Sequence, residues 1–158
     1  MSATMADMTV RRDVPSFAAE ESGVPVPALS HVFAHDNDLV IVTTGCAAYR
    51  TGISFSLLVL SRQAIDFVTE FAFGIAQRRH AGSLDLAASA TLRNGSEQSI
   101  DLGVFGGDAA TSHRADFRFW VPLPDDADAA RVRLTWPTMQ VDDTAAIDIR
   151  LFRHASGE

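Results

Sequence analysis

Two histidines and two carboxylates gather in a short segment whose residue types suit metal binding. His31 and His35 lie four residues apart, and Asp36 and Asp38 follow them closely. On a helix, histidines four residues apart share a face and can bind zinc together. On extended backbone about 13 Å separates them, which is too far for one ion without a bend. Because a proline-rich stretch precedes the segment and an apolar run follows it, we expect a solvated turn and no metal site.

The motifs of nucleophilic catalysis are incomplete in this sequence. The segment GISFS, from Gly52 to Ser56, lacks the second glycine of a nucleophile elbow. Cys46 is the only cysteine, and no predicted helix N-terminus precedes it to lower its pKa. We therefore interpret Cys46 as a small buried apolar residue. The sequence also contains no GxGxxG motif and no P-loop, so it predicts no catalytic residue and no cofactor.

Two charged clusters remain as candidates for binding. The tightest basic cluster is a candidate anion site, since guanidinium groups make charge-assisted hydrogen bonds to phosphate; it consists of Arg78, Arg79 and His80. The alternative is a loop that is merely solvated. Residues 125–128 form an acidic loop, but paired-carboxylate catalysis needs one carboxyl group that is partly buried with a raised pKa. Because this loop is rich in small polar residues, we expect its carboxylates to be exposed to solvent.

The elements that must position these residues are predicted to be β-strands. Continuous or alternating apolar runs predict strands over 38–42 and 53–60, and the run over 38–42 is typical of a strand covered on both faces. Three later segments place apolar residues at every second position: Phe117, Phe119 and Val121; Val132, Leu134 and Trp136; Ile147, Ile149 and Leu151. Because successive side chains of a strand point to opposite faces, each segment has one apolar face and one mostly polar face.

Turn signals separate the predicted strands. Gly52 closes the turn YRTG, where we expect it to supply a positive φ angle. Asn94-Gly95 lies between two alternating runs and predicts a hairpin with a type I′ turn. The segments 122–130 and 137–146 are interpreted as connections between antiparallel strands. Residues 63–77 fit either a helix or a strand, and the surrounding all-β pattern favours a strand.

Most aromatic residues are predicted to fill the core, because the rows that contain Phe117, Phe119 and Trp136 face inward. Trp120 and Phe152 are different, since each falls on the polar row of its segment. We expect them to be at least partly exposed and to form, with Arg118 and Arg150, the contact surface for a partner. The alternative is that these two aromatic side chains pack under a loop or under the N-terminal arm.

Composition indicates one globular domain. The chain has 158 residues, 47% of them hydrophobic, and a net charge of -7, which disfavours a nucleic-acid partner because phosphates repel an acidic surface. All 13 basic residues are Arg, which excludes lysine-dependent chemistry. One cysteine permits no internal disulfide, and no apolar stretch resembles a signal peptide or a membrane span. We therefore expect a cytoplasmic protein without membrane insertion.

Several short motifs resemble a group of small uncharacterised single-domain all-β proteins from GC-rich bacteria. These motifs are AYRTGISFSLLV, the turn LRNGSEQ, the aromatic segment FWVPLP and the Trp-Pro ending of VRLTWP. The resemblance covers about two thirds of the chain and leaves out the segment from Ala64 to Gly82. It implies an all-β fold, and no function or site residue comes with it.

Together these patterns predict an all-β, two-sheet antiparallel immunoglobulin-like sandwich of about seven or eight strands. Residues 1–28 are expected to form a flexible or extended N-terminal arm, and residues 29–158 the sandwich domain. We predict a non-enzymatic protein-interaction or structural module whose partner is a protein, including a second copy of itself. The competing hypothesis is a small-ligand, metal-binding or hydrolytic protein with a loop-built site that draws on histidines such as His31, His35, His80 or His113.

Overall fold

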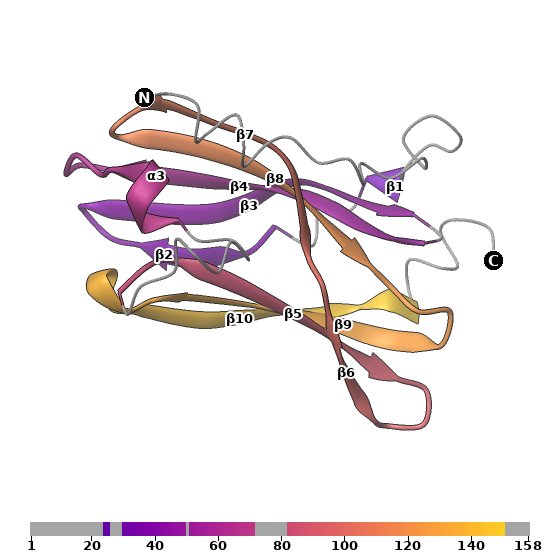
Figure 1. Cartoon of the computed structure of the whole chain (residues 1–158). Coiled ribbons are helices and arrows are strands. Elements are labelled where there is room, and N and C mark those ends of the chain that lie inside the picture. The colour runs from indigo at the N-terminus through magenta and orange to yellow at the C-terminus, as the bar shows by residue number, and fades with distance from the viewer. Residues whose placement is uncertain (1–23, 26–29, 50, 72–81, 151–158) are drawn as a thin grey trace.

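The computed structural model describes residues 24–25, 30–49, 51–71 and 82–150 and shows two antiparallel β-sheets packed face to face (Figure 1). The six-stranded sheet, the upper layer in Figure 1, has the strand order β1-β3-β4-β8-β7, with β2 also paired to β3. Its strands are β1 (Val24–Pro25), β2 (Val32–His35), β3 (Leu39–Tyr49), β4 (Gly52–Ser61), β7 (Gly103–Thr111) and β8 (Arg114–Pro122). The predicted all-β sandwich is confirmed.

The four-stranded sheet forms the lower layer, in the order β10-β9-β5-β6. Its strands are β5 (Asp85–Leu92), β6 (Glu97–Ile100), β9 (Ala127–Trp136) and β10 (Val141–Asp148). Successive hairpins alternate between the layers, because β3–β4 and β7–β8 pair in one sheet while β5–β6 and β9–β10 pair in the other. The chain therefore crosses between the layers after β4, β6 and β8. The described part contains ten strands, more than predicted, since strands as short as β1 carry too few residues to show an alternating pattern.

The core lies between the two sheets and consists of the predicted inward rows. Val132 and Leu134 of β9 are 3% and 0% exposed, and Ile147 and Ile149 at the end of the chain's last hairpin are 8% and 3% exposed. The largest fully buried side chains come from both sheets: Trp136, Phe71, Phe117, Phe119, Ile41, Ile53, Leu57, Leu84, Leu134, Val59 and Val121. The two-residue alternation therefore predicted correctly which face of these strands is buried.

The segment favoured as a strand begins instead with a short helix, α3 (Phe67–Glu70), so that interpretation is wrong for these residues. Asp66 caps the helix, because its carboxylate accepts hydrogen bonds from the Thr69 amide and hydroxyl at 3.3 and 2.7 Å. The helical spacing places the rings of Phe67 and Phe71 on the same side, 4.9 Å apart, and both are buried. The helix thus closes one end of the core, with Phe71 packed against Trp136 of β9 at 5.4 Å. Residues 72–77 lie outside the described part.

Two of the predicted turns have a different geometry from the expected one. The hairpin at Asn94-Gly95 is present, but only Gly95 has a positive φ, of 88°, so the turn is not type I′. The Gly95 amide donates to the Leu92 carbonyl at 2.8 Å, and Leu92 donates to Ser96, which is the pattern of a type I turn followed by a bulged glycine. Gly52 also lacks a positive φ; it leaves room for the Trp120 ring, as argued below.

The connection predicted over 137–146 is much shorter in the structure. A single 3-10 turn, η3 (Pro137–Met139), and the left-handed Gln140 reverse the chain, and β10 begins at Val141. Residues 141–146 are therefore strand, because a turn of four residues is enough to join antiparallel neighbours. No helix in the described ranges is long and apolar enough to cross a membrane.

Candidate functional site

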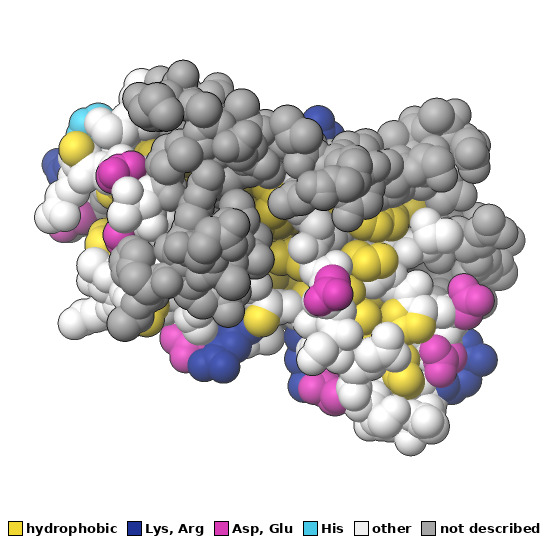
Figure 2. All heavy atoms as spheres, in the orientation of Figure 1, with side chains coloured by type: hydrophobic (Ala, Val, Ile, Leu, Met, Phe, Trp, Pro, Cys, Tyr) yellow, Lys and Arg dark blue, Asp and Glu magenta, His cyan; other side chains and the backbone are white. Residues whose placement is uncertain are grey.

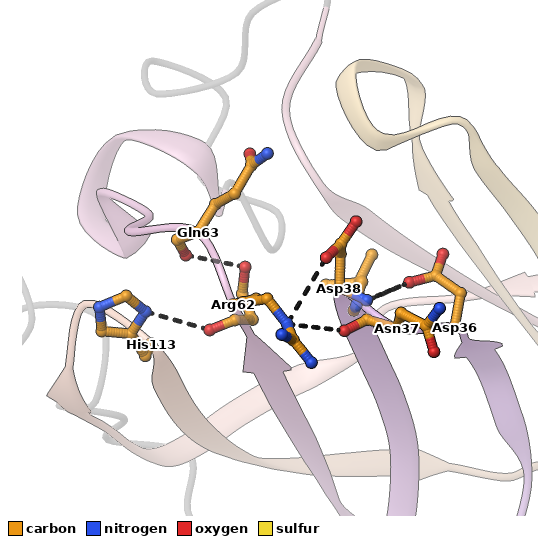
Figure 3. A network of polar contacts seen from close by, with 8 residues as sticks. Asp36, Asn37, Asp38, Arg62, Gln63 and His113 are labelled. Atoms are coloured by element: carbon orange, nitrogen blue, oxygen red, sulfur yellow. Dashed lines mark hydrogen bonds and ion pairs between the residues drawn. The ribbon is translucent and has the colours of Figure 1, made fainter.

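A network of polar residues joins three loops at the end of the sandwich that carries α3 (Figure 3). Its parts are the β2–β3 turn (residues 36–38), the end of β4 with the following residues 62–65, and the β7–β8 turn (residues 112–113). Backbone bonds hold these parts together: Arg62 donates to the Asp38 carbonyl at 2.8 Å, and Ile65 donates to the Ser112 carbonyl at 2.7 Å. The loops are therefore fixed relative to one another by main-chain contacts.

Both carboxylates of this network have partners: Asp36 bonds to backbone amides of its own turn, and Asp38 pairs with Arg62. Asp36 Oδ1 accepts hydrogen bonds from the backbone amides of Asp38 and Leu39 at 2.7 and 2.8 Å, and these two bonds hold the Asp36 pKa below its usual value. Arg62 Nε donates to the Asn37 carbonyl at 3.0 Å and lies 3.6 Å from Asp38 Oδ1. The side chains of Arg62 and Asp38 are 75% and 66% exposed, so this ion pair is weak.

His113 links the β7–β8 turn to the end of β4. Its Nδ1 lies 3.1 Å from the Ser61 carbonyl, which only accepts, so Nδ1 is the donor of this hydrogen bond. The Ser61 hydroxyl does not donate to this ring, since it donates to the Gln63 carbonyl at 2.8 Å. These contacts stabilise three loops, and no catalytic pair forms among them.

The histidine candidates within the described residues, His31, His35 and His113, lie on different elements. His31 precedes β2 and its Nε2 lies 2.8 Å from Asp143 Oδ2 of β10, so it links the two sheets. This hydrogen bond to the His31 imidazole is the main reason that the pKa of Asp143 lies below its usual value. His35 ends the extended strand β2, and His113 lies in the β7–β8 turn. Within the described ranges, no group of three or more His, Cys, Asp or Glu residues could hold a metal ion.

The predicted partner-contact residues that are described, Trp120, Arg118 and Arg150, belong to two different sheets. Trp120 is 8% exposed, so the expectation that it is exposed is wrong. Arg118 is exposed on β8 of the six-stranded sheet, whereas Arg150 follows β10 of the other sheet and bonds to Asp148 at 3.1–3.3 Å. Phe152 lies outside the described residues. The alternating pattern assigned Trp120 to the outer face correctly but could not show what covers that face.

The basic cluster Arg78, Arg79 and His80 also lies outside the described residues, so its anion site stays a prediction. Cys46 is buried at 9% exposure, and burial raises the pKa of its thiol to about 11. The void beside it is only about 10 Å³ and is lined by apolar side chains and Thr43. A void of this size holds at most about one water molecule, so it is no ligand pocket.

The outer face of the four-stranded sheet carries paired charges. Arg133 donates to both oxygens of Asp142 at 2.9 and 2.7 Å, and Arg131 bonds to Glu97 at 3.2 Å. Figure 2 shows acidic and basic side chains next to one another along the lower side of the molecule. A face of this kind is well solvated and offers little apolar area to a partner.

The outer face of the six-stranded sheet carries an apolar patch, which we name the β2–β4 patch. It consists of five aliphatic side chains on three neighbouring strands: Val32, Val40, Val42, Leu58 and Leu60. Val32 is opposite Val42, Val42 is opposite Leu58, and Val40 is opposite Leu60, so the side chains are cross-strand neighbours about 5 Å apart. Val32 is 52% exposed and the other four are half-buried.

The rim of this patch is polar. Across β8, Asp116 is opposite Leu58 and Arg114 is opposite Leu60, and these two charged side chains pair at 3.3 Å. An apolar patch with a polar rim is typical of a protein contact surface. The sequence held a signal for it, because the apolar runs over 38–42 and 53–60 place apolar residues on both faces of their strands. For the run over 38–42, this signal was interpreted as a strand covered on both faces.

The chain matches no known family model, and no curated protein is similar to it in sequence.

Proposed function

We propose that this chain is a non-enzymatic protein-interaction module that binds a protein partner through the β2–β4 patch. The observation that carries the proposal is the contrast between the two outer faces. Arginine–carboxylate pairs cover the four-stranded sheet, whereas five cross-strand aliphatic side chains stand on the six-stranded sheet. Leaving Val32 more than half exposed costs free energy in the isolated protein, and a partner that covers the patch removes that cost.

The strand order supports an immunoglobulin-like assignment of the scaffold. The order β3-β4-β8-β7 corresponds to strands A-B-E-D of that fold, and β10-β9-β5-β6 corresponds to G-F-C-C′. The chain has one cysteine, so it lacks the disulfide between the sheets of antibody domains. In this assignment the β2–β4 patch lies on the A-B side of the sandwich, where β2 and β1 extend the sheet beyond strand A. The predicted cytoplasmic location fits a scaffold without that disulfide.

The size of the patch favours a modest affinity. Five aliphatic side chains make up the apolar centre of a contact, while a standard protein interface buries about 800 Å² on each partner. The rest of the contact must then come from the polar rim, including Arg114 and Asp116, which are 54% and 44% exposed. Truncating one central side chain is expected to weaken binding about 10-fold or more.

The test replaces Val42 and Leu58 together with Thr, which places a β-branched residue of high strand propensity at both positions and removes apolar area. The control is Ala146→Thr, at an exposed position of β10 in the other sheet. Concentration-dependent light scattering tests self-association, and quantitative capture from an extract of the source cell tests other protein partners. We expect the double variant to lose the association while the control keeps it. Both variants must retain the wild-type circular dichroism spectrum.

Three results would contradict the proposal. If the double variant associates as the wild type does, or if the Ala146→Thr control loses the association as well, the β2–β4 patch is not the contact surface. A wild-type chain that stays monomeric and captures no protein would contradict the proposed function itself.

A further inference from the structure

We propose that the β2–β4 patch binds the same patch on a second copy of this chain, in a dimer with twofold symmetry. The inference rests on the proposed function and names the partner that the proposed function leaves open. A twofold contact joins a surface to itself, so the surface must carry side chains that complement one another across the axis. The order of the side chains on the patch and its rim meets this condition.

The patch and its rim form two rows that run across the strands. The first row contains neighbours on β2, β3, β4 and β8: His35, Val40, Leu60 and Arg114. The second row contains neighbours on the same four strands: Val32, Val42, Leu58 and Asp116. Strands β3 and β4 thus contribute an aliphatic side chain to each row, whereas β8 contributes a cation to the first and an anion to the second.

A twofold axis that lies between the two rows, in the plane of the face and perpendicular to the strands, exchanges the rows. Val40 of one copy then faces Val42 of the second copy, and Leu60 faces Leu58 in the same way. The apolar centres of the two patches therefore meet. Sheets that pack face to face lie about 10 Å apart, a gap that aliphatic side chains from both sheets fill.

The same axis places Arg114 of each copy opposite Asp116 of the other. Both side chains are exposed on β8, and within one copy they lie 3.3 Å apart. The long Arg side chain and the shorter Asp side chain can together bridge the gap of about 10 Å between two stacked sheets. Two copies thus bring four charges of alternating sign together at the rim, and this complementarity favours the symmetric pairing over other orientations.

An axis parallel to the strands does not give this match. It would place β8 of one copy over β2 of the second copy, with Asp116 against Val32 and Arg114 against His35. A carboxylate that faces a valine loses water without gaining a hydrogen-bond partner, which costs free energy. With the axis perpendicular to the strands, Val32 instead faces His35, whose ring has an apolar body.

Reversing the rim charges tests the proposal in the full-length chain. Arg114→Asp places carboxylates opposite one another across the axis, and Asp116→Arg does the same with guanidinium groups. Each variant is expected to raise the dimer dissociation constant about 10-fold or more, measured by sedimentation equilibrium. An equal mixture of the two variants restores opposite charges, so we expect native mass spectrometry to show mainly mixed pairs. A chain that carries both substitutions is expected to associate as the wild type does.

The matched control is the exposed pair Arg133 and Asp142 on the four-stranded sheet, which lie 2.7 Å apart. Arg133→Asp and Asp142→Arg change the net charge by the same amounts as the two rim variants. We expect each control variant to leave the dissociation constant unchanged and their mixture to show no preference for mixed pairs. All variants must retain the wild-type circular dichroism spectrum.

The second-copy proposal is overturned if the rim variants associate as the wild type does, if their mixture does not recover association, or if the control variants behave in the same way. A wild-type chain that stays monomeric at its highest soluble concentration also overturns it. In that case, capture of another protein that is lost with Val42→Thr and Leu58→Thr leaves the proposed function standing. A monomeric chain without such capture contradicts both proposals.

Discussion

Gly52 lies where β4 and β8 leave no room for an added side-chain atom, and replacing this residue with Ala tests this close packing directly. A Cβ at position 52 would lie 2.4 Å from the Val121 carbonyl oxygen and 2.5 and 2.6 Å from Cζ2 and Cη2 of Trp120. Real Cβ atoms essentially never lie within 3.0 Å of another heavy atom, so backbone or ring must move. The backbone of Gly52 has no positive φ, and the cost of the substitution is therefore one of space.

The size of the effect follows from what must move. The carbonyl belongs to a paired strand, and the indole is buried, so neither can shift freely. Overpacking of a well-packed site costs about 1–3 kcal/mol. For a chain of this length, a loss of 1 kcal/mol lowers the melting temperature by about 2–4 °C. Gly52→Ala is thus expected to lower the melting temperature by about 2–12 °C.

Calorimetry and urea unfolding of Gly52→Ala and Gly103→Ala measure this effect. Gly103 also borders Trp120, but its added Cβ would meet only ordinary contacts, at 3.9 and 4.0 Å. Gly103→Ala is therefore expected to change the free energy of unfolding by less than about 1 kcal/mol. Any increase in stability would come from the lower conformational entropy of the unfolded chain. In a Trp120→Leu background the cost of Gly52→Ala should fall, because the ring contacts are gone and the carbonyl contact remains. Equal stability of the two alanine variants would refute the argument from close approach.

Three further predictions address the core and the loops. Phe71→Ala removes a fully buried ring that packs on Phe67, Phe117 and Trp136, and is expected to lower the free energy of unfolding by about 3–5 kcal/mol in urea titrations. The pKa of Asp143 is depressed in the folded state, so its bond to His31 stabilises the fold above the ordinary value of 3.8 and this contribution is lost as the pH falls through the folded pKa. Asp143→Asn should therefore be less stable than the wild type near neutral pH, by at most about 1 kcal/mol because the His31 and Asp143 side chains are 32% and 45% exposed. The difference in the free energy of unfolding should vanish in acid, below the folded pKa of Asp143. A difference that persists there would contradict this assignment. Burial raises the Cys46 pKa to about 11, so iodoacetamide is expected to label it only after unfolding, and rapid labelling of the folded chain, seen by mass spectrometry, would show the thiol to be accessible.

The sequence was sufficient to predict the layers of the fold, since alternation reports which side of a strand faces the core. Val132, Leu134, Ile147 and Ile149 were placed inward by their spacing alone, and all four are buried. The same rule failed for residues 67–70, because a helix of one turn is too short to show a period. The important residue in this segment is Asp66, because its carboxylate caps the helix and so stabilises helical backbone at this point of the chain.

The candidate site was harder to predict than the fold. Histidines 31, 35 and 113 were grouped by residue type, yet their positions depend on which loops meet at one end of the sandwich. That meeting depends on strand order: β4 and β8 are neighbours, so the β7–β8 turn lies against the end of β4, where the Ser61 amide donates to the His113 carbonyl at 2.8 Å. Local patterns carry no information on the order of strands that are far apart in sequence.

Trp120 shows the limit of the alternating pattern most clearly. Its position beside Arg118 identified the outer face correctly, but burial depends on everything that lies over a face and on the size of the neighbouring side chains. The described neighbours of Trp120 include four small residues, Gly52, Gly103, Ser54 and Ala47; its ring leans over Gly52 and meets Tyr49 edge-on. Two glycines and two small residues around one large ring are a sequence signal for close packing, yet they become neighbours only after three strands have paired. The outer face of the six-stranded sheet is thus divided by side-chain size: small residues accommodate Trp120 at one end, and branched aliphatic residues form the β2–β4 patch at the other.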